Sequence, residues 1–152
     1  MKMITMKTLI KEEISNRLGL VKILTKLPYI DFFIIEDLLG YSTDKTMEVI
    51  QLFLNNTEEY YSYIDLSDSN ITSLGKLRYV GEGLNLNNSK ILSFGNLEYV
   101  GGNLDIRETA IEDLGKLRRV VGDFKVYGTP LWFKKGTRDI KKQVDIGGNL
   151  HS

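Results

Sequence analysis

The sequence contains no cysteine and a single histidine, His151, among its 152 residues. Without cysteine, it cannot form a disulfide, a thiolate zinc site or a cysteine nucleophile. One histidine also leaves a Ser-His-Asp triad or a histidine metal site close to excluded. Adjacent carboxylates occur, but no base partner accompanies them. We therefore expect a non-enzymatic protein with no cofactor and no metal.

An excess of charge and a long hydrophobic run are also missing. Lysine plus arginine and aspartate plus glutamate each number 20, so net charge does not favour nucleic acid or a membrane as partner. The richest apolar stretch, residues 27–39, includes Pro28 and Asp31 and is too short and too charged to span a bilayer. No apolar segment typical of a secretory signal is found near Met1. We expect a cytoplasmic protein without membrane contact.

What the sequence does contain is an internal repeat of 20 residues. Three complete units span 64–83, 84–103 and 104–123, and a fourth, 124–143, keeps its beginning and then loses the pattern. A fifth is predicted to begin at Val144. Two apolar columns stand at the start of each unit, Ile64, Leu84, Leu104, Phe124, Val144 and Leu66, Leu86, Ile106, Val126, Ile146. A column of hydroxyl residues follows, Ser69, Ser89, Thr109, Thr129. A third apolar column stands near the end of each unit, Val80, Val100, Val120, Ile140.

This spacing predicts a stack of short strands. Two apolar residues separated by one polar residue place both apolar side chains on one face of a strand. A unit of this length cannot bury them alone, so stacked units must join each column into an apolar ladder and pair their strands into a parallel sheet. The hydroxyl column can bond backbone groups that each turn would otherwise leave unpaired.

The repeats resemble the leucine-rich repeat family, in its short form common in bacteriophage and bacterial proteins. The fourth unit matches the family segment with Val121, Phe124, Val126, Thr129 and Leu131. Two departures are that Ser or Thr replaces the family asparagine and that glycine often replaces the leading leucine. The resemblance covers residues 64–152 and implies a parallel β solenoid there. With helices predicted before it, we expect an α/β fold in which the solenoid follows a helical N-terminal cap.

Residues 1–63 lack the repeat and are predicted to form that helical cap. Apolar residues at helical spacing predict a helix over 9–27, which Pro28 stops. A second, largely buried helix is expected over 30–39, ended by Gly40. Ser42 or Thr43 can begin a third helix that runs to about Leu54. Such helices would cover the apolar edge of the first repeat.

The strand face is the predicted binding surface. Side chains between the two buried strand positions should point outward, and these differ between units while the buried columns stay uniform. The outward columns are Asp65, Asn85, Asp105, Lys125 and Asp145, flanked by Ser67, Asn87, Arg107 and Tyr127. The candidate protein-binding residues are Asn85, Asn87, Asp105, Arg107, Lys125, Tyr127 and Trp132. The resemblance to phage repeats further implies an adaptor or inhibitor that occludes a target protein.

Two other functions remain open. Residues 34–50 have the outline of a helix-turn-helix, and lysines and arginines of 76–78, 116–119 and 134–142 form a basic ridge, so nucleic acid is one alternative partner. Residues 1–63 hold seven basic and nine acidic side chains, which weakens that alternative. The second alternative is a self-assembling structural protein, for instance a homodimer joined through the apolar Val144, Ile146 and Leu150.

Overall fold

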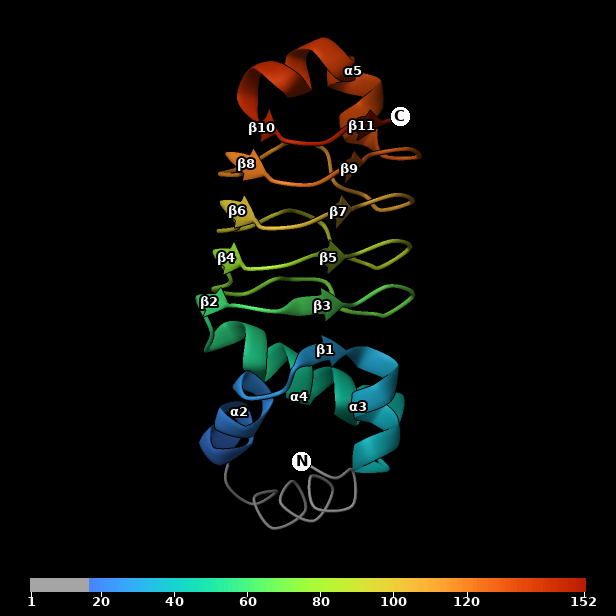
Figure 1. The fold of residues 1–152 in the computed structure, drawn as a ribbon. Coiled ribbons are helices and arrows are strands. Elements are labelled where there is room, and N and C mark those ends of the chain that lie inside the picture. Colours follow the sequence, from blue (N-terminus) through green and yellow to red (C-terminus); the bar gives the residue numbers. More distant parts are fainter. Residues whose placement is uncertain (1–16) are drawn as a thin grey trace.

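The computed structural model describes residues 17–152 and confirms an α/β fold (Figure 1). The described part of the chain has four helices, which are α2 (Arg17–Thr25), α3 (Phe32–Leu39), α4 (Thr43–Asn55) and α5 (Pro130–Gln143). Helices α2, α3 and α4 lie at one end of a stack of strands, and α5 lies at the other end.

The strands form two sheets in which every neighbouring pair is parallel. The six-stranded sheet contains, in order, β1 (Tyr29–Asp31), β3 (Tyr63–Asp65), β5 (Leu84–Asn85), β7 (Leu104–Asp105), β9 (Phe124–Lys125) and β11 (Leu150–His151). The five-stranded sheet contains β2 (Glu59–Tyr60), β4 (Tyr79–Val80), β6 (Tyr99–Val100), β8 (Arg119–Val120) and β10 (Asp145–Ile146). The sequence pattern predicted the first of these sheets and missed the second.

The strand register follows the 20-residue repeat through the first four units. Ile64 pairs with Leu84, Leu84 with Leu104, and Leu104 with Phe124. In the other sheet, Val80 pairs with Val100 and Val100 with Val120. These partners are the residues that the sequence aligns, so the predicted apolar ladders are confirmed over these units.

The prediction for the fifth unit is wrong. Leu150, not Val144, pairs with Phe124, and Ile146 pairs with Val120, the place expected for Ile140. Helix α5 occupies most of the fourth unit, which lengthens the step from Arg119 to its neighbour Asp145 to 26 residues. A prediction that assumes a constant step of 20 residues therefore gives the wrong partners for the last strands. Asp145 consequently belongs to the five-stranded sheet and not to the predicted strand face.

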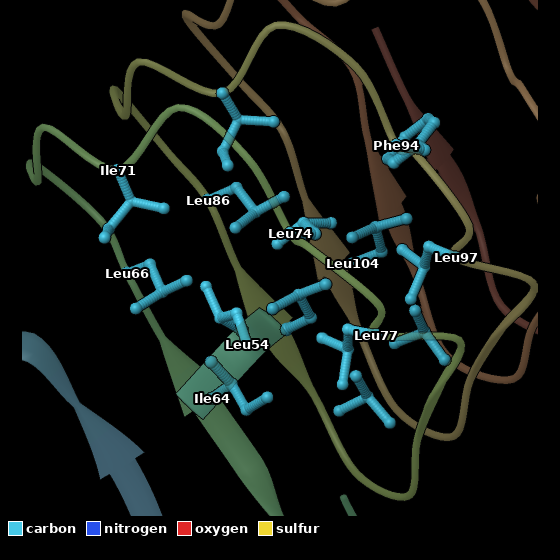
Figure 2. Packing of buried hydrophobic residues seen from close by; sticks show 14 of the residues in the cluster. Leu54, Ile64, Leu66, Ile71, Leu74, Leu77, Leu86, Phe94, Leu97 and Leu104 are labelled. Atoms are coloured by element: carbon cyan, nitrogen blue, oxygen red, sulfur yellow. The ribbon is translucent and has the colours of Figure 1, made fainter. Parts of the chain in front are cut away.

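One continuous apolar core runs through the described helices and both sheets. Figure 2 shows the part of it in which Leu54 of α4 lies beside residues of the first units. Ile64, Leu84, Leu104 and Phe124 are each at most 1% exposed. Full burial of an apolar side chain of this size stabilises a protein by about 1.5–3 kcal/mol, so the aligned columns account for much of the driving force for stacking.

The hydroxyl column bonds the backbone as predicted. The Ser69 Oγ donates to the Leu66 carbonyl at 2.6 Å, and the Thr109 Oγ1 donates to the Ile106 carbonyl at 2.7 Å. Both residues are buried. Each of these hydroxyls closes the turn that follows a strand of the six-stranded sheet. The buried carbonyl that accepts its hydrogen bond would otherwise have no partner in the turn.

The expected helix boundaries are partly confirmed. Residues 9–16 of the first predicted helix lie outside the described part, and α2 ends at Thr25. The second helix starts at Phe32, not at residue 30, because residues 29–31 pair as β1 with β3. Gly40 ends that helix in the left-handed conformation, with φ of 63°. The Ser42 Oγ accepts a hydrogen bond from the Lys45 N–H, which confirms the predicted start of α4.

Candidate protein-interaction surface

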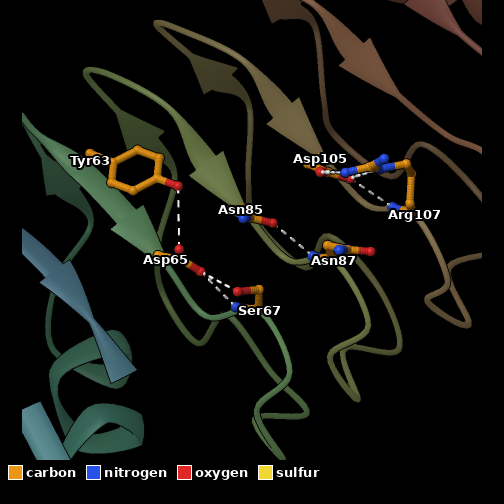
Figure 3. Close-up of polar contacts among 7 residues, drawn as sticks. All are labelled: Tyr63, Asp65, Ser67, Asn85, Asn87, Asp105 and Arg107. Atoms are coloured by element: carbon orange, nitrogen blue, oxygen red, sulfur yellow. Dashed lines mark hydrogen bonds and ion pairs between the residues drawn. The ribbon is translucent and has the colours of Figure 1, made fainter. Parts of the chain in front are cut away.

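All of the predicted candidate residues except Trp132 belong to the six-stranded sheet or to the turns that follow its strands. Figure 3 shows four of them, Asn85, Asn87, Asp105 and Arg107. Asp65, Asn85, Asp105 and Lys125 are successive neighbours along the sheet. We call this surface the strand face, and it comprises these four residues together with Ser67, Asn87, Arg107 and Tyr127. His151 of β11 extends it beyond Lys125.

Three side chains of the strand face are held in the turns that follow their strands. In each case the side-chain Oδ1 accepts a hydrogen bond from the backbone N–H two residues later. Ser67 donates to Asp65 at 2.9 Å, Asn87 donates to Asn85 at 3.0 Å, and Arg107 donates to Asp105 at 3.1 Å. The residues that follow these turns, Asp68, Asn88 and Glu108, have positive φ. Local side-chain bonds of this kind stabilise tight turns, so Asn85 and Asp105 have a structural role that was not predicted from the sequence.

Asp105 also departs from its predicted exposure, since it is 7% exposed. The guanidinium of Arg107 folds over its carboxylate, with Nε donating to Oδ1 at 2.9 Å and Nη2 donating to Oδ2 at 2.7 Å. These hydrogen bonds raise the pKa of Arg107 above its ordinary value. The Arg107 side chain nevertheless remains 41% exposed, so it presents apolar and donor surface to solvent while its charge is partly neutralised.

The fourth unit breaks the pattern of the first three. Lys125 occupies the position of Asp65, Asn85 and Asp105 and has no carboxylate oxygen to accept the turn N–H. Tyr127 follows with 59% exposure. The fourth unit therefore contributes two side chains to the strand face that have no counterpart of the turn hydrogen bonds in the earlier units.

A polar cluster joins β11 to the end of the strand face. The Asp123 Oδ1 accepts the Asn149 N–H at 2.9 Å, and the His151 Nε2 lies 3.1 Å from the Asp123 Oδ2. These bonds, that of Asn149 first, hold the pKa of Asp123 below its ordinary value, and Lys125 adds a smaller effect in the same direction.

Trp132, the remaining candidate, is placed differently. It lies in the first turn of α5, where its backbone N–H donates to the Thr129 Oγ1 at 3.2 Å. Its side chain is partly buried against the apolar core. The structure therefore does not bring Trp132 into the strand face.

The apolar residues expected to leave an open C-terminal end are largely covered. Val144 is 1% exposed, and Ile146 and Leu150 pack against the core. This end offers less apolar surface for a second copy than the sequence indicated.

A ladder of tyrosines on the five-stranded sheet was not predicted from the sequence. Tyr79 and Tyr99 are neighbours in β4 and β6, with ring centroids 4.6 Å apart and ring planes within 2°. Tyr61 packs on Tyr79 at 5.6 Å and is 68% exposed. The Leu-x-Tyr-Val motif that recurs at 77–80 and 97–100 could have indicated this ladder.

Much of the predicted basic ridge is interleaved with acidic residues. Arg78 lies 2.8 Å from Glu59 and 3.5 Å from Glu98, and Arg118 lies 3.4 Å from Glu98. Lys134 pairs with Glu112 further along. A nucleic-acid surface needs cations free to meet phosphates, so these pairs do not favour that alternative. Residues 34–50 form parts of helices α3 and α4, and Asp44 and Glu48 flank Lys45 on the second of these helices.

No other site stands out in residues 17–152. They contain no group of three or more histidine, cysteine or acidic side chains placed to hold a metal. None of the described helices is both long enough and apolar enough to cross a membrane. A shallow hollow lies between α4 and the first unit, lined in part by Met47, Gln51, Asn70 and Thr72. Its Gln51 amide is already bonded to the Asn55 Oδ1 and the Ser73 carbonyl.

Comparisons with known proteins add no relative. Neither the family models nor the curated proteins nor the solved structures contain a match to this chain.

Proposed function

We propose that this chain is a leucine-rich-repeat-like solenoid that works as a non-enzymatic protein-binding module. The support is the 20-residue register of four units, which keeps the buried columns uniform while the residues of the strand face change. A fixed core with an adjustable surface is the arrangement by which repeat proteins present binding sites.

In this proposal, helices α2 to α4 are the N-terminal cap. Phe53 and Leu54 of α4 are fully buried in the shared core, and the Leu54 carbonyl accepts the Lys76 N–H of the first unit at 3.0 Å. The α4 helix therefore provides the contacts that a further unit would otherwise make, which is what a cap must do.

The observation that carries the function is the contrast within the strand face. Asp65, Asn85 and Asp105 are bound in turn hydrogen bonds, whereas Lys125 and Tyr127 replace that arrangement in the fourth unit. Because Asp105 pairs with Lys125 along the sheet, Arg107 and Tyr127 stand one unit apart in the same column. Tyrosine and arginine are the residue types that most often dominate binding energy at protein interfaces.

The chemistry of these groups suggests how a partner would be held. Tyr127 offers an amphipathic ring, Arg107 a partly exposed guanidinium, and Lys125 a positive charge. A partner surface with an apolar pocket and carboxylates at its rim would complement them. The action would then be occlusion of the partner's own surface, as the resemblance to phage repeats implies.

The test is affinity capture from a lysate of the native host with three versions of the protein. The first is the wild type and the second carries Arg107→Ala with Tyr127→Ala. The third is a matched control, Lys90→Ala with Leu92→Ala, which removes an exposed cation and an exposed apolar side chain that are not among the residues of the strand face.

We expect the wild type and the control to retain the same partner protein in equal amounts. The double variant should retain at least about tenfold less of it, because it lacks two hot-spot side chains. Thermal unfolding of all three versions checks that the loss is not a loss of folding. Equal retention by all three versions would exclude the strand face as the binding surface.

A further inference from the structure

The outer face of the five-stranded sheet has an order of residues that is complementary to itself. From β2 to β8, successive neighbours along this face are Glu59, Tyr79, Tyr99 and Arg119. An acid begins the series, two tyrosines form its middle and a base ends it. We call these four residues the tyrosine column.

Reversing the tyrosine column and laying it on itself pairs unlike charges. A two-fold axis between two facing sheets, running along the strands midway between β4 and β6, places Tyr79 of one copy against Tyr99 of the other. The same axis places Glu59 of each copy against Arg119 of the other. An interface between identical chains must be self-complementary in this way when its symmetry is two-fold.

The charge distribution of the whole chain favours the same antiparallel arrangement. Residues 31–68 contain nine acidic and one basic side chain, whereas residues 116–142 contain nine basic and two acidic ones. These segments belong to opposite ends of the stack (Figure 1). An antiparallel pair brings the acidic half of each copy to the basic half of the other, whereas a parallel pair would place like charges together.

The side chains of this face are at least partly accessible for such a contact, with Tyr79 and Tyr99 half-buried. Glu59 and Arg119 keep 40% and 41% of their side-chain surface exposed, although they pair with Arg78 and Asp145 within the chain. Exposed ion pairs contribute little to folding, so these residues can take part in a second pair across an interface. The neighbouring Tyr61 adds exposed aromatic surface next to Tyr79.

We propose that the chain forms a two-fold symmetric homodimer through the tyrosine column, with Glu59 of each copy facing Arg119 of the other. The partner is a second copy of this chain, because its own charge order supplies the complement that the face requires. The strand face belongs to the other sheet, so this interface is independent of the proposed protein-binding function and can fail or hold separately from it.

The experiment uses two charge reversals, Glu59→Arg and Arg119→Glu, with the molar mass measured by sedimentation velocity over a concentration series. Each variant alone would place like charges at both contacts of the dimer, two arginines in the first case and two glutamates in the second. Mixing the two variants would restore an unlike pair at both contacts. Glu48→Arg and Lys142→Glu are the controls, since they reverse exposed charges in the same halves of the chain but on helices α4 and α5, outside the strands of the five-stranded sheet.

If the proposal holds, the wild type is a dimer, and the two controls change its dissociation constant much less than the reversals on the tyrosine column do, because their charges act only at longer range. Each single reversal raises that constant at least about tenfold, an effect typical of charge contacts at an interface, and the equimolar mixture returns it to near the wild-type value. The neutral variants Glu59→Gln and Arg119→Gln give a second measure, a smaller weakening without repulsion. Far-UV circular dichroism confirms folding of each variant.

Three results would overturn the proposal. The first is a wild type that stays monomeric at the highest concentration reached. The second is a dimer whose constant does not respond to either reversal or to the neutral variants, which would place the interface elsewhere. The third is two weakened variants whose mixture does not recover.

Discussion

The backbone N–H of Trp132 donates to the Thr129 Oγ1 at 3.2 Å, so the hydroxyl that closes a turn in the other units begins a helix in the fourth. The same Oγ1 donates to the Val126 carbonyl at 2.6 Å, as Ser69 and Thr109 do to theirs. Thr129 is fully buried. One side chain thereby joins the repeat to helix α5.

Replacing Thr129 should test this double role. Thr129→Ala removes the turn bond and the helix N-cap together and should lower the free energy of unfolding by about 1–3 kcal/mol. Thr129→Ser keeps both bonds and should cost less. Thr109→Ala, which removes the bond to the Ile106 carbonyl in a unit without a helix, is the comparison, and its smaller loss in urea unfolding is expected. Equal losses for Thr129→Ala and Thr109→Ala would show that the helix N-cap adds nothing.

The bond between Asp105 and its turn gives a second prediction. Asp105→Asn keeps an oxygen for the Arg107 N–H, as Asn85 does for Asn87, and loses the ion pair with the guanidinium. Because that guanidinium is partly exposed, the loss should stay below about 1 kcal/mol. Asp105→Ala also leaves the turn N–H without its acceptor and should cost about 1–2 kcal/mol. Urea unfolding of the two variants measures the difference, and no difference would assign the stabilisation to the ion pair alone.

The repeat could be predicted from the sequence because its buried residues recur at fixed spacing. The pairing of Leu84 with Leu104 required no more than that spacing. The pairing of Leu150 with Phe124 could not be predicted in the same way, because α5 changes the length of the unit and the pattern does not record by how much.

The candidate site, too, could be predicted from the sequence only in part. The alternation of the strand predicted which column Asp105 and Lys125 belong to, and the sheet register agrees. The alternation does not predict how exposed each residue is, because exposure depends on contacts between side chains. The Arg107 side chain, for example, covers Asp105. The tyrosine ladder was missed because the second sheet was not expected, although Tyr79 and Tyr99 recur at the repeat spacing.

Phe94 should be the most sensitive position of its column. It takes the place of Leu74 and Leu114, is fully buried, and has its ring centroid 6.3 Å from that of Phe124. Phe94→Ala leaves a cavity in the middle of the stack and should cost about 3–5 kcal/mol. Phe94→Leu introduces the residue of the neighbouring units and should cost clearly less. Guanidinium unfolding measures both, and equal costs would indicate that ring volume does not determine the packing there.

The polar cluster at β11 predicts how stability changes with pH. The Asn149 N–H, and after it His151, lower the pKa of Asp123 below its ordinary value of 3.8. A carboxyl whose pKa is lower in the folded chain stabilises the fold above its unfolded pKa, and this stabilisation is lost as the pH falls through the folded pKa. Wild-type protein should therefore melt at a higher temperature than Asp123→Asn at about pH 7, and the gap should close below about pH 3. Asp139→Asn, an exposed change in α5, is the control and should not affect the melting temperature. A gap between wild type and Asp123→Asn that stays constant in acid would show that ionisation of Asp123 does not hold β11 against β9.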